Sequence, residues 1–241
     1  MTKRFLAALQ FLTVLPIRGS TATPGQAAIF FAITGALLGT SAGAVFLAAN
    51  PGMGRSTAAL LSIGWLLFLT GCLHEDGLAD VADAVRAGRT REKVLAILKD
   101  SRIGTYGALA LIVSLLLRWQ ALAQSPVNPV LGLAATLAIS RSAMVVLAAT
   151  TPSVSDGLGR AFAAEISQPV LLIVAAQALA FSLLAGWAHA IAMTLASALT
   201  ILLARTWFLR RLGGVNGDCL GATCQAVETL NLVILAWRHS T

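Results

Sequence analysis

The chain has 241 residues, of which 57% are hydrophobic and 11% are charged, and its formal net charge at pH 7 is +7. Its apolar residues come in runs long enough to cross about 30 Å of hydrocarbon, which excludes an ordinary soluble domain. The basic residues are scattered through short connections and form no stripe that alternates with aromatic residues, so we expect no nucleic-acid partner. We expect an all-α fold, a polytopic membrane helical bundle that forms a single integral-membrane domain over residues 1–241.

The first predicted element is an interfacial or re-entrant helix that ends at Leu15-Pro16, because its apolar core is short and interrupted. About seven transmembrane helices follow, at about 28–49, 57–73, 106–123, 129–150, 169–186, from a tight link at 186–189 to 204, and at 220–237. In the first span, Gly35, Gly39 and Gly43 are spaced four residues apart. Such a stripe of small residues lets another helix approach closely.

Basic residues gather in alternate connections between these spans. One side of the membrane receives Lys3, Arg4, Arg18, Arg86, Arg89, Arg91, Lys93, Lys99, Arg102, Arg160, Arg205, Arg210 and Arg211. The other side receives Arg55 and Arg238, so the positive-inside rule makes the first side cytoplasmic. Acidic residues concentrate in the same connections, although they carry little topological weight. We therefore expect a multi-pass membrane protein with a site that faces the cytoplasm.

The segment from His74 to Asp83 directly follows the second span and holds four of the chain's ten acidic residues. On a helix, Asp76, Asp80 and Asp83 are spaced i, i+4, i+7 and share one face. A helix cap or a favourable interaction with the helix dipole explains one or two of these acids, but not three on one face. We therefore favour a divalent-cation site that acts on a phosphate. His74 could ligate the metal, contact a phosphate or be structural.

A second cluster, at residues 99–107, combines Lys99, Asp100, Arg102 and Gly104 just before the third span. Arginine and lysine bind phosphate, glycine allows close backbone approach, and the start of a helix adds positive potential. A basic flank that snorkels to the membrane surface is an equally good interpretation.

A third cluster, at residues 212–222, places Gly217 and Asp218 at the mouth of the last span. Turn chemistry and an N-cap would explain it, but Asp218 could also supply a further metal carboxylate opposite the Asp76 helix.

Three ionisable residues lie inside predicted spans, where charge is costly. Arg141 and Glu228 could form a structural ion pair, or Arg141 could reach a substrate phosphate. Arg118 lies nearer the outer end of its span, so we expect its side chain to snorkel.

Together these pieces resemble the cobalamin synthase family, also called adenosylcobinamide-GDP ribazoletransferase. The family pattern His-x-Asp-Gly-x-x-Asp-x-x-Asp matches 74–83, and Asp-Ser-Arg-x-Gly-Thr-x-Gly matches 100–107. Shorter matches follow the family order at 11–16, 140–141, 157–159 and 213–222, with an acid downstream at Glu228. The chain departs from the usual family residues at Val14, where arginine is common, and at Asn216, where threonine is common.

The resemblance implies a transferase of coenzyme B12 assembly that joins adenosylcobinamide-GDP to α-ribazole or its 5′-phosphate, releases GMP and uses Mg²⁺. It implies metal ligation by Asp76, Asp80, Asp83 and Asp218, with Asp80 or Asp83 as the catalytic base. Residues expected to bind substrate or its phosphates are His74, Lys99, Asp100, Arg102, Gly104, Arg141 and Gly217. Beyond the metal, no tightly bound cofactor is expected, and a homo-oligomer is left open.

Two alternatives remain. A CDP-alcohol phosphotransferase of phospholipid synthesis would use similar chemistry, but its motif Asp-Gly-x-x-Ala-Arg reads Asp-Gly-Leu-Ala-Asp here and lacks its second half. A cation transporter would place carboxylates at the bilayer midplane, whereas most acids here lie at one mouth of the spans.

Overall fold

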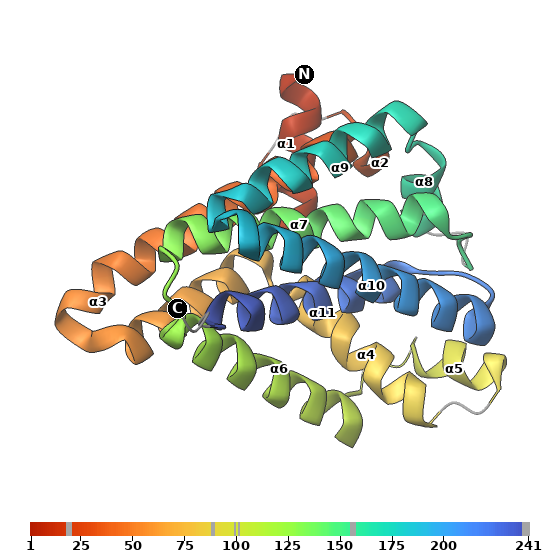
Figure 1. The fold of residues 1–241 in the computed structure, drawn as a ribbon. Helices are drawn as coiled ribbons and strands as arrows, with labels where there is room; N and C mark the ends of the chain where they lie inside the picture. Colours follow the sequence, from red (N-terminus) through yellow and green to blue (C-terminus); the bar gives the residue numbers. More distant parts are fainter. Residues whose placement is uncertain (18–20, 88–89, 99, 101, 155–157, 238–241) are drawn as a thin grey trace.

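The computed structural model describes all residues except 18–20, 88–89, 99, 101, 155–157 and 238–241 (Figure 1). The described part of the chain is a bundle of helices without a β-strand, apart from one isolated bridge between Ser153 and Val215. Six of its helices are long and apolar enough to cross a membrane: Pro24–Thr70, Thr105–Gln124, Pro129–Thr150, Gln168–Ala185, Trp187–Leu212 and Gly217–Ala236. The predicted all-α polytopic membrane bundle is confirmed.

Helix α3 (Phe31–Thr70) is folded back on itself, as Figure 1 shows at the end of the bundle farthest from α5. The reversal occurs at Gly54, whose φ of 75° and ψ of 164° lie outside the helical region. Across it, the Ser62 hydroxyl donates a hydrogen bond to the Ala42 carbonyl at 2.7 Å, so the two arms lie side by side. These arms correspond to the first and second predicted spans, which reconciles seven predicted spans with six apolar helices.

Helix α7 (Pro129–Thr150) is the most deeply buried of the apolar helices and lies against the first arm of α3. Gly35, Gly39 and Gly43 make this close packing possible. A Cβ at Gly39 would lie 2.2 Å from the Leu133 carbonyl oxygen, and the other two glycines meet the α7 backbone as closely. The stripe of small residues is therefore a helix-packing surface, as its spacing predicted.

The predicted N-terminal helix is α1 (Thr2–Leu12), which packs against α2 (Pro24–Ala27) and the start of α3. It ends earlier than predicted because Thr13 adopts an extended conformation. The Thr13 hydroxyl donates to the Leu9 carbonyl at 2.6 Å and closes the last turn. The chain then runs along α3, where the Val14 amide donates to the Leu69 carbonyl at 2.8 Å.

Helix α4 (Leu73–Ala87) is the element that positions the acidic segment. Gly71 and Cys72 both adopt left-handed conformations, with φ values of 60° and 58°, and turn the chain out of α3. Helix α4 then packs between α6 (Thr105–Gln124) and α11 (Gly217–Ala236).

The remaining helices complete the bundle: α5 (Arg91–Ile97), α8 (Leu158–Ala164), α9 (Gln168–Ser182) and α10 (Trp187–Leu212). Short helices α5 and α8 lie at the same end of the bundle, opposite the Gly54 turn (Figure 1).

Candidate active site

The close packing of α4 on α11 brings together carboxylates that lie far apart in the sequence. A Cβ at Gly77 would lie 2.8 Å from the Asp218 carbonyl oxygen, so only a glycine lets the two helices approach this closely. Asp76 and Asp80 are carried by α4, and Asp218 by the first turn of α11. The fold therefore places Asp218 opposite the Asp76 helix, as the sequence predicted.

These carboxylates repel one another. Partial burial, together with the negative charges of Asp76, Asp218 and Asp83, raises the pKa of Asp80 from 3.8 to about 6. Within the described residues, no lysine or arginine forms an ion pair with Asp76, Asp80, Asp83 or Asp218. A negative cluster without a basic partner is the kind of donor set that hard divalent cations prefer.

The fit to a metal rests on the chemistry of these donors, not on a finished coordination geometry. In the part of the chain that the structure describes, no three His, Cys, Asp or Glu side chains have the spacing of a metal site. Asp218 is already oriented: the Asn216 amide donates to its Oδ2 at 2.7 Å. Asn216 also caps α11 by accepting from the Cys219 amide at 3.0 Å. Asn216, one of the two residues that depart from the family pattern, therefore orients Asp218, which a polar residue before Gly-Asp at a helix start could have suggested.

Asp83 lies at the far end of the same α4 face and binds the start of α6. Its two oxygens accept from the Gly104 amide at 2.7 Å and the Gly107 amide at 2.9 Å. A Cβ at either glycine would fall 2.4 Å from an Asp83 oxygen, so these glycines make room for the carboxylate. Gly104, predicted to bind phosphate, here donates its N–H to Asp83. The metal and catalytic roles of Asp83 and the phosphate role of Gly104 stay predictions.

The predicted phosphate cluster continues into an exposed loop before α6. Arg102 Nη2 lies 2.6 Å from Asp100 Oδ2, and the Arg102 side chain is 86% exposed. These bonds lower the pKa of Asp100 to about 2. An exposed pair of this kind is weak, so little free energy opposes transfer of Arg102 to a phosphate. Lys99 lies outside the described residues, as does Gly157 of the short glycine motif.

A buried charge network ties α4 to the bundle beneath the carboxylates. Arg118 of α6 donates to Glu75 of α4 at 2.9 Å and to Glu228 of α11 at 2.6 Å. Gln225 joins the network by donating to Glu75 at 2.9 Å and accepting from Arg118 at 3.1 Å. Arg141 of α7 is paired with Glu228 as well. Two arginines and two glutamates balance in charge, which is the condition for burying them among apolar helices.

This network changes two sequence interpretations. The expectation that Arg118 snorkels was wrong: its side chain is 1% exposed and points into the bundle, because Glu75 and Glu228 lie there. Arg141 forms the structural ion pair that was one of its two alternatives, and its contact with a substrate phosphate stays a prediction. Glu75 is the residue that the sequence reasoning missed, since it was grouped with the acids at the mouth although it faces inward.

His74 occupies the first turn of α4 and is completely buried. Within the described structure, neither of its ring nitrogens has a hydrogen-bond partner. It lines a cavity together with Asp76, Gly217 and Asp218. A Cβ on Gly217 would meet nothing within 4 Å, so this part of the α11 start is open.

The fold and this site define a polytopic membrane protein with a polar centre of carboxylates at one end of its helices. A family model for cobalamin-5-phosphate synthase matches residues 4–236. The chain belongs to that family, and it is a transferase of cobalamin biosynthesis, as the resemblance implied.

Curated relatives support the same assignment, and all three described next are named adenosylcobinamide-GDP ribazoletransferase. One from Vibrio cholerae is 38% identical over 96% of this chain and 92% of its own length. One from Bradyrhizobium diazoefficiens is 37% identical, with 95% and 91% covered. One from Klebsiella pneumoniae is 36% identical, with 98% and 100% covered. No solved structure matches the chain.

Proposed function

We propose that this protein joins adenosylcobinamide-GDP to α-ribazole or its 5′-phosphate and releases GMP, the activity for which its relatives are named. The observation that carries the proposal is the group of carboxylates Asp76, Asp80 and Asp218 at the contact of α4 with α11, which form no ion pair within the described residues. The exposed Arg102 precedes the start of α6, which binds Asp83 of the same α4 face. Transfer to a ribose hydroxyl from a diphosphate needs both a cation-binding centre and groups that hold phosphate oxygens.

In this proposal, Asp76, Asp80 and Asp218 would hold Mg²⁺, with Asn216 keeping the Asp218 carboxylate in position. When bound, the ion supplies positive charge that neutralises the diphosphate and the charge that develops during transfer. Asp83 instead anchors the start of α6, because both of its oxygens already accept amide hydrogen bonds.

The protein's own residues carry the transfer. A ribose hydroxyl oxygen of α-ribazole forms a bond to the phosphorus attached to the cobinamide arm, and the bond from that phosphorus to the oxygen of GMP breaks. Asp80 accepts the hydroxyl proton, since of the two predicted bases it is the one whose oxygens are not committed to backbone amides. Arg102, released from Asp100, and Lys99 hold oxygens of the departing GMP phosphate.

We further propose that the site faces the cytoplasm of a bacterium from its inner membrane. The C-terminal parts of α4 and α10 and the start of α6 lie toward the end of the bundle that holds α5 and α8 (Figure 1). They carry or adjoin Arg86, Arg102, Arg205 and Arg210, so the positive-inside rule assigns this end to the cytoplasm. Both the nucleotide-linked substrate and GMP are charged, and an aqueous compartment must supply and receive them.

The test uses purified full-length protein in detergent with Mg²⁺, adenosylcobinamide-GDP and α-ribazole 5′-phosphate, with corrinoid product and GMP followed by chromatography. The Asp80→Asn variant is compared with Glu92→Gln, an exposed acid in the first turn of α5. We expect product from the parent and from Glu92→Gln, and at least a hundredfold less from Asp80→Asn.

If Asp80→Asn formed as much product as the parent, Asp80 would be neither an essential metal ligand nor the catalytic base. Release of CMP from a CDP-alcohol, with no corrinoid product, would replace the proposal with the phospholipid alternative.

A further inference from the structure

A cavity of about 250 Å³ adjoins the carboxylates, and its walls differ in chemistry. One wall is polar or open, with His74, Asp76, Gly217 and Asp218. The other is apolar and is built from five helices, α1, α4, α7, α8 and α11, which supply Phe11, Leu73, Met144, Phe162 and Leu220 in that order. A ligand that fits both walls has an apolar body and one end that can reach the carboxylates.

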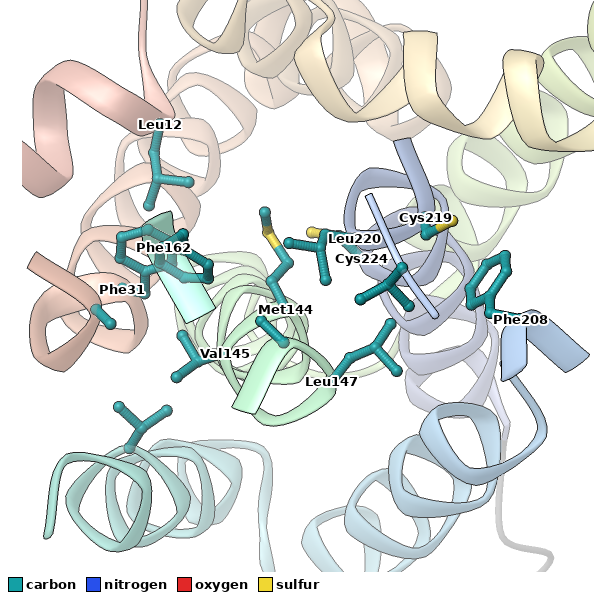
Figure 2. Close-up of a cluster of buried hydrophobic side chains, with 14 of the residues drawn as sticks. Leu12, Phe31, Met144, Val145, Leu147, Phe162, Phe208, Cys219, Leu220 and Cys224 are labelled. Atoms are coloured by element: carbon teal, nitrogen blue, oxygen red, sulfur yellow. The ribbon is translucent and has the colours of Figure 1, made fainter. Parts of the chain in front are cut away.

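The apolar wall is built from stacked rings. Phe11 and Phe162 are nearly parallel, at an interplanar angle of 5° with centroids 6.1 Å apart. Phe31 stacks with both, its ring centroid 5.3 Å from that of Phe162 and 5.6 Å from that of Phe11. Figure 2 shows Met144 standing between Phe162 and Leu220. Flat rings and a thioether favour contact with another flat ring.

The polar wall contains a side chain that lacks a partner. His74 is 0% exposed, and neither Nδ1 nor Nε2 makes a hydrogen bond within the described structure. A neutral imidazole carries one N–H donor and one acceptor, and leaving these buried and unpaired is costly. A ligand atom that forms a hydrogen bond with His74 removes that cost, so the imidazole is suited to recognise a ligand bound in the cavity.

The size of the cavity restricts the ligand further. Pockets for drug-sized molecules begin at roughly 300 Å³, so this cavity holds a fragment such as one bicyclic base. A corrin ring or a whole nucleotide must lie outside it.

Two bicyclic bases enter the reaction proposed above, and their edges differ. Guanine carries donors and acceptors around most of its perimeter, and the Phe11, Phe162 and Leu220 wall would leave them unpaired. A benzimidazole has an apolar carbocyclic edge and one ring nitrogen with a free lone pair, which a single N–H donor satisfies.

We propose that this cavity is the binding site for the benzimidazole base of the attacking substrate, with the base stacked along Phe11 and Phe162 and its free ring nitrogen accepting from His74. This inference rests on the proposed function, because that function makes α-ribazole a substrate. With the base seated there, the attached ribose emerges beside Asp76 and Asp218, at the carboxylate end of the cavity. His74 is then a residue that selects the base, distinct from the residues that move the phosphoryl group.

The experiment measures binding of α-ribazole to the full-length protein by calorimetry without Mg²⁺, and separately the KM values for α-ribazole 5′-phosphate and adenosylcobinamide-GDP. His74→Leu removes the donor, His74→Asn retains an N–H, and Phe162→Leu removes a stacking face without touching His74. His189→Leu, in the first turn of α10 at the opposite end of the bundle, is the matched control.

We expect His74→Leu to raise the Kd and KM for the ribazole substrate about tenfold or more. The KM for adenosylcobinamide-GDP should remain within about twofold. Recovery by His74→Asn and weaker ribazole binding by Phe162→Leu would support the assignment.

Unchanged ribazole binding in both His74→Leu and Phe162→Leu would overturn it, and so would a shift confined to adenosylcobinamide-GDP or to inhibition by GMP. If the protein binds α-ribazole through His74 but forms no corrinoid product, the proposed reaction is contradicted. The assignment of this cavity as the base-binding site would still stand.

Discussion

Partial burial and the neighbouring carboxylates disfavour the ionised form of Asp80. Its neighbours raise its pKa to about 6, so the folded protein binds a proton there more tightly than the unfolded chain, whose value is 3.8. The stability that this proton contributes is complete below pH 3.8 and is lost as the pH rises through about 6. Above that range, the ionised carboxylate destabilises the metal-free fold.

We therefore predict that Asp80→Asn raises the melting temperature of the metal-free protein at pH 7.5 by a few degrees, although we expect it to lower product formation at least a hundredfold. The difference from the parent should shrink as the pH falls from 7 to 4, because the parent carboxyl then becomes neutral too. Thermal unfolding in detergent with a chelator measures this effect. Adding Mg²⁺ should stabilise the parent and leave Asp80→Asn nearly unchanged. Equal stabilisation of both proteins by Mg²⁺ would place the cation elsewhere.

The buried network makes the opposite prediction for Glu228. The variant Glu228→Gln removes the carboxylate that Arg118 and Arg141 share and leaves Glu75, which is paired with Arg118, as the acid of the network. An uncompensated buried charge costs about 3–5 kcal/mol, whereas breaking a fully exposed pair costs little because water screens it. Unfolding of Glu228→Gln in detergent, compared with Asp100→Asn from the exposed Arg102 pair, should show this contrast. Similar losses in both would mean that water reaches the network.

At the scale of elements, the site depends on how closely α4 can approach its neighbours. Helix α4 leaves α3 through two left-handed residues, Gly71 and Cys72, and is then fixed at both ends. Near its start, Glu75 joins Arg118, and near its end, Asp83 accepts from the first amides of α6. Between them, Gly77 contacts the backbone of α11. Positions of the carboxylates therefore follow from helix packing.

Gly77→Ala tests that dependence. Its new Cβ would lie 2.8 Å from the Asp218 carbonyl oxygen, so α4 and α11 must separate and the distances from Asp76 and Asp80 to Asp218 must grow. We expect a loss of about 1–3 kcal/mol in stability and a clear fall in turnover. The control is Gly64→Ala on the exposed side of α3, where a Cβ meets nothing within 4 Å. That change should be neutral or slightly stabilising, because alanine favours helix. Full activity in Gly77→Ala would show that the site tolerates looser packing.

At the scale of the whole molecule, the two ends of the bundle differ in chemistry. One end carries α5 and α8, which hold Arg91, Lys93 and Arg160, and the other carries the Gly54 turn with Arg55 beside it (Figure 1). This polarity supports a defined orientation in the membrane.

Orientation can be measured by labelling single cysteines in intact cells, in a Cys72→Ser background because Cys72 is exposed. Met53→Cys, beside the Gly54 turn and 60% exposed as methionine, should react with a membrane-impermeant maleimide added outside. Glu92→Cys on α5 should react only after the membrane is permeabilised. The reverse pattern would place the carboxylates outside the cytoplasm and contradict the proposed orientation.

Local sequence patterns predicted much of this molecule. Apolar runs set the spans, and the spacing of Gly35, Gly39 and Gly43 predicted a close helix contact that the α3–α7 interface confirms. The motifs from His74 to Asp83 and from Asp100 to Gly107 led to the family that the comparisons show. These features could be recognised because each lies within a few turns of one helix or one loop.

Only the tertiary structure decided which charged residue faces which. Arg118 and Glu75 are 43 residues apart and Arg118 and Glu228 are 110 apart, so no local pattern could pair them or turn Arg118 inward. Asp76, Asp80 and Asp83 share a helical face, yet the packing of α11 and α6 gives Asp83 different neighbours from the other two. The sequence by itself determined a helical membrane transferase and its family, because hydrophobicity and motifs are properties of the chain. The carboxylate cluster, the buried network and the cavity beside His74 are properties of helix packing, because each needs side chains that only the folded bundle brings together.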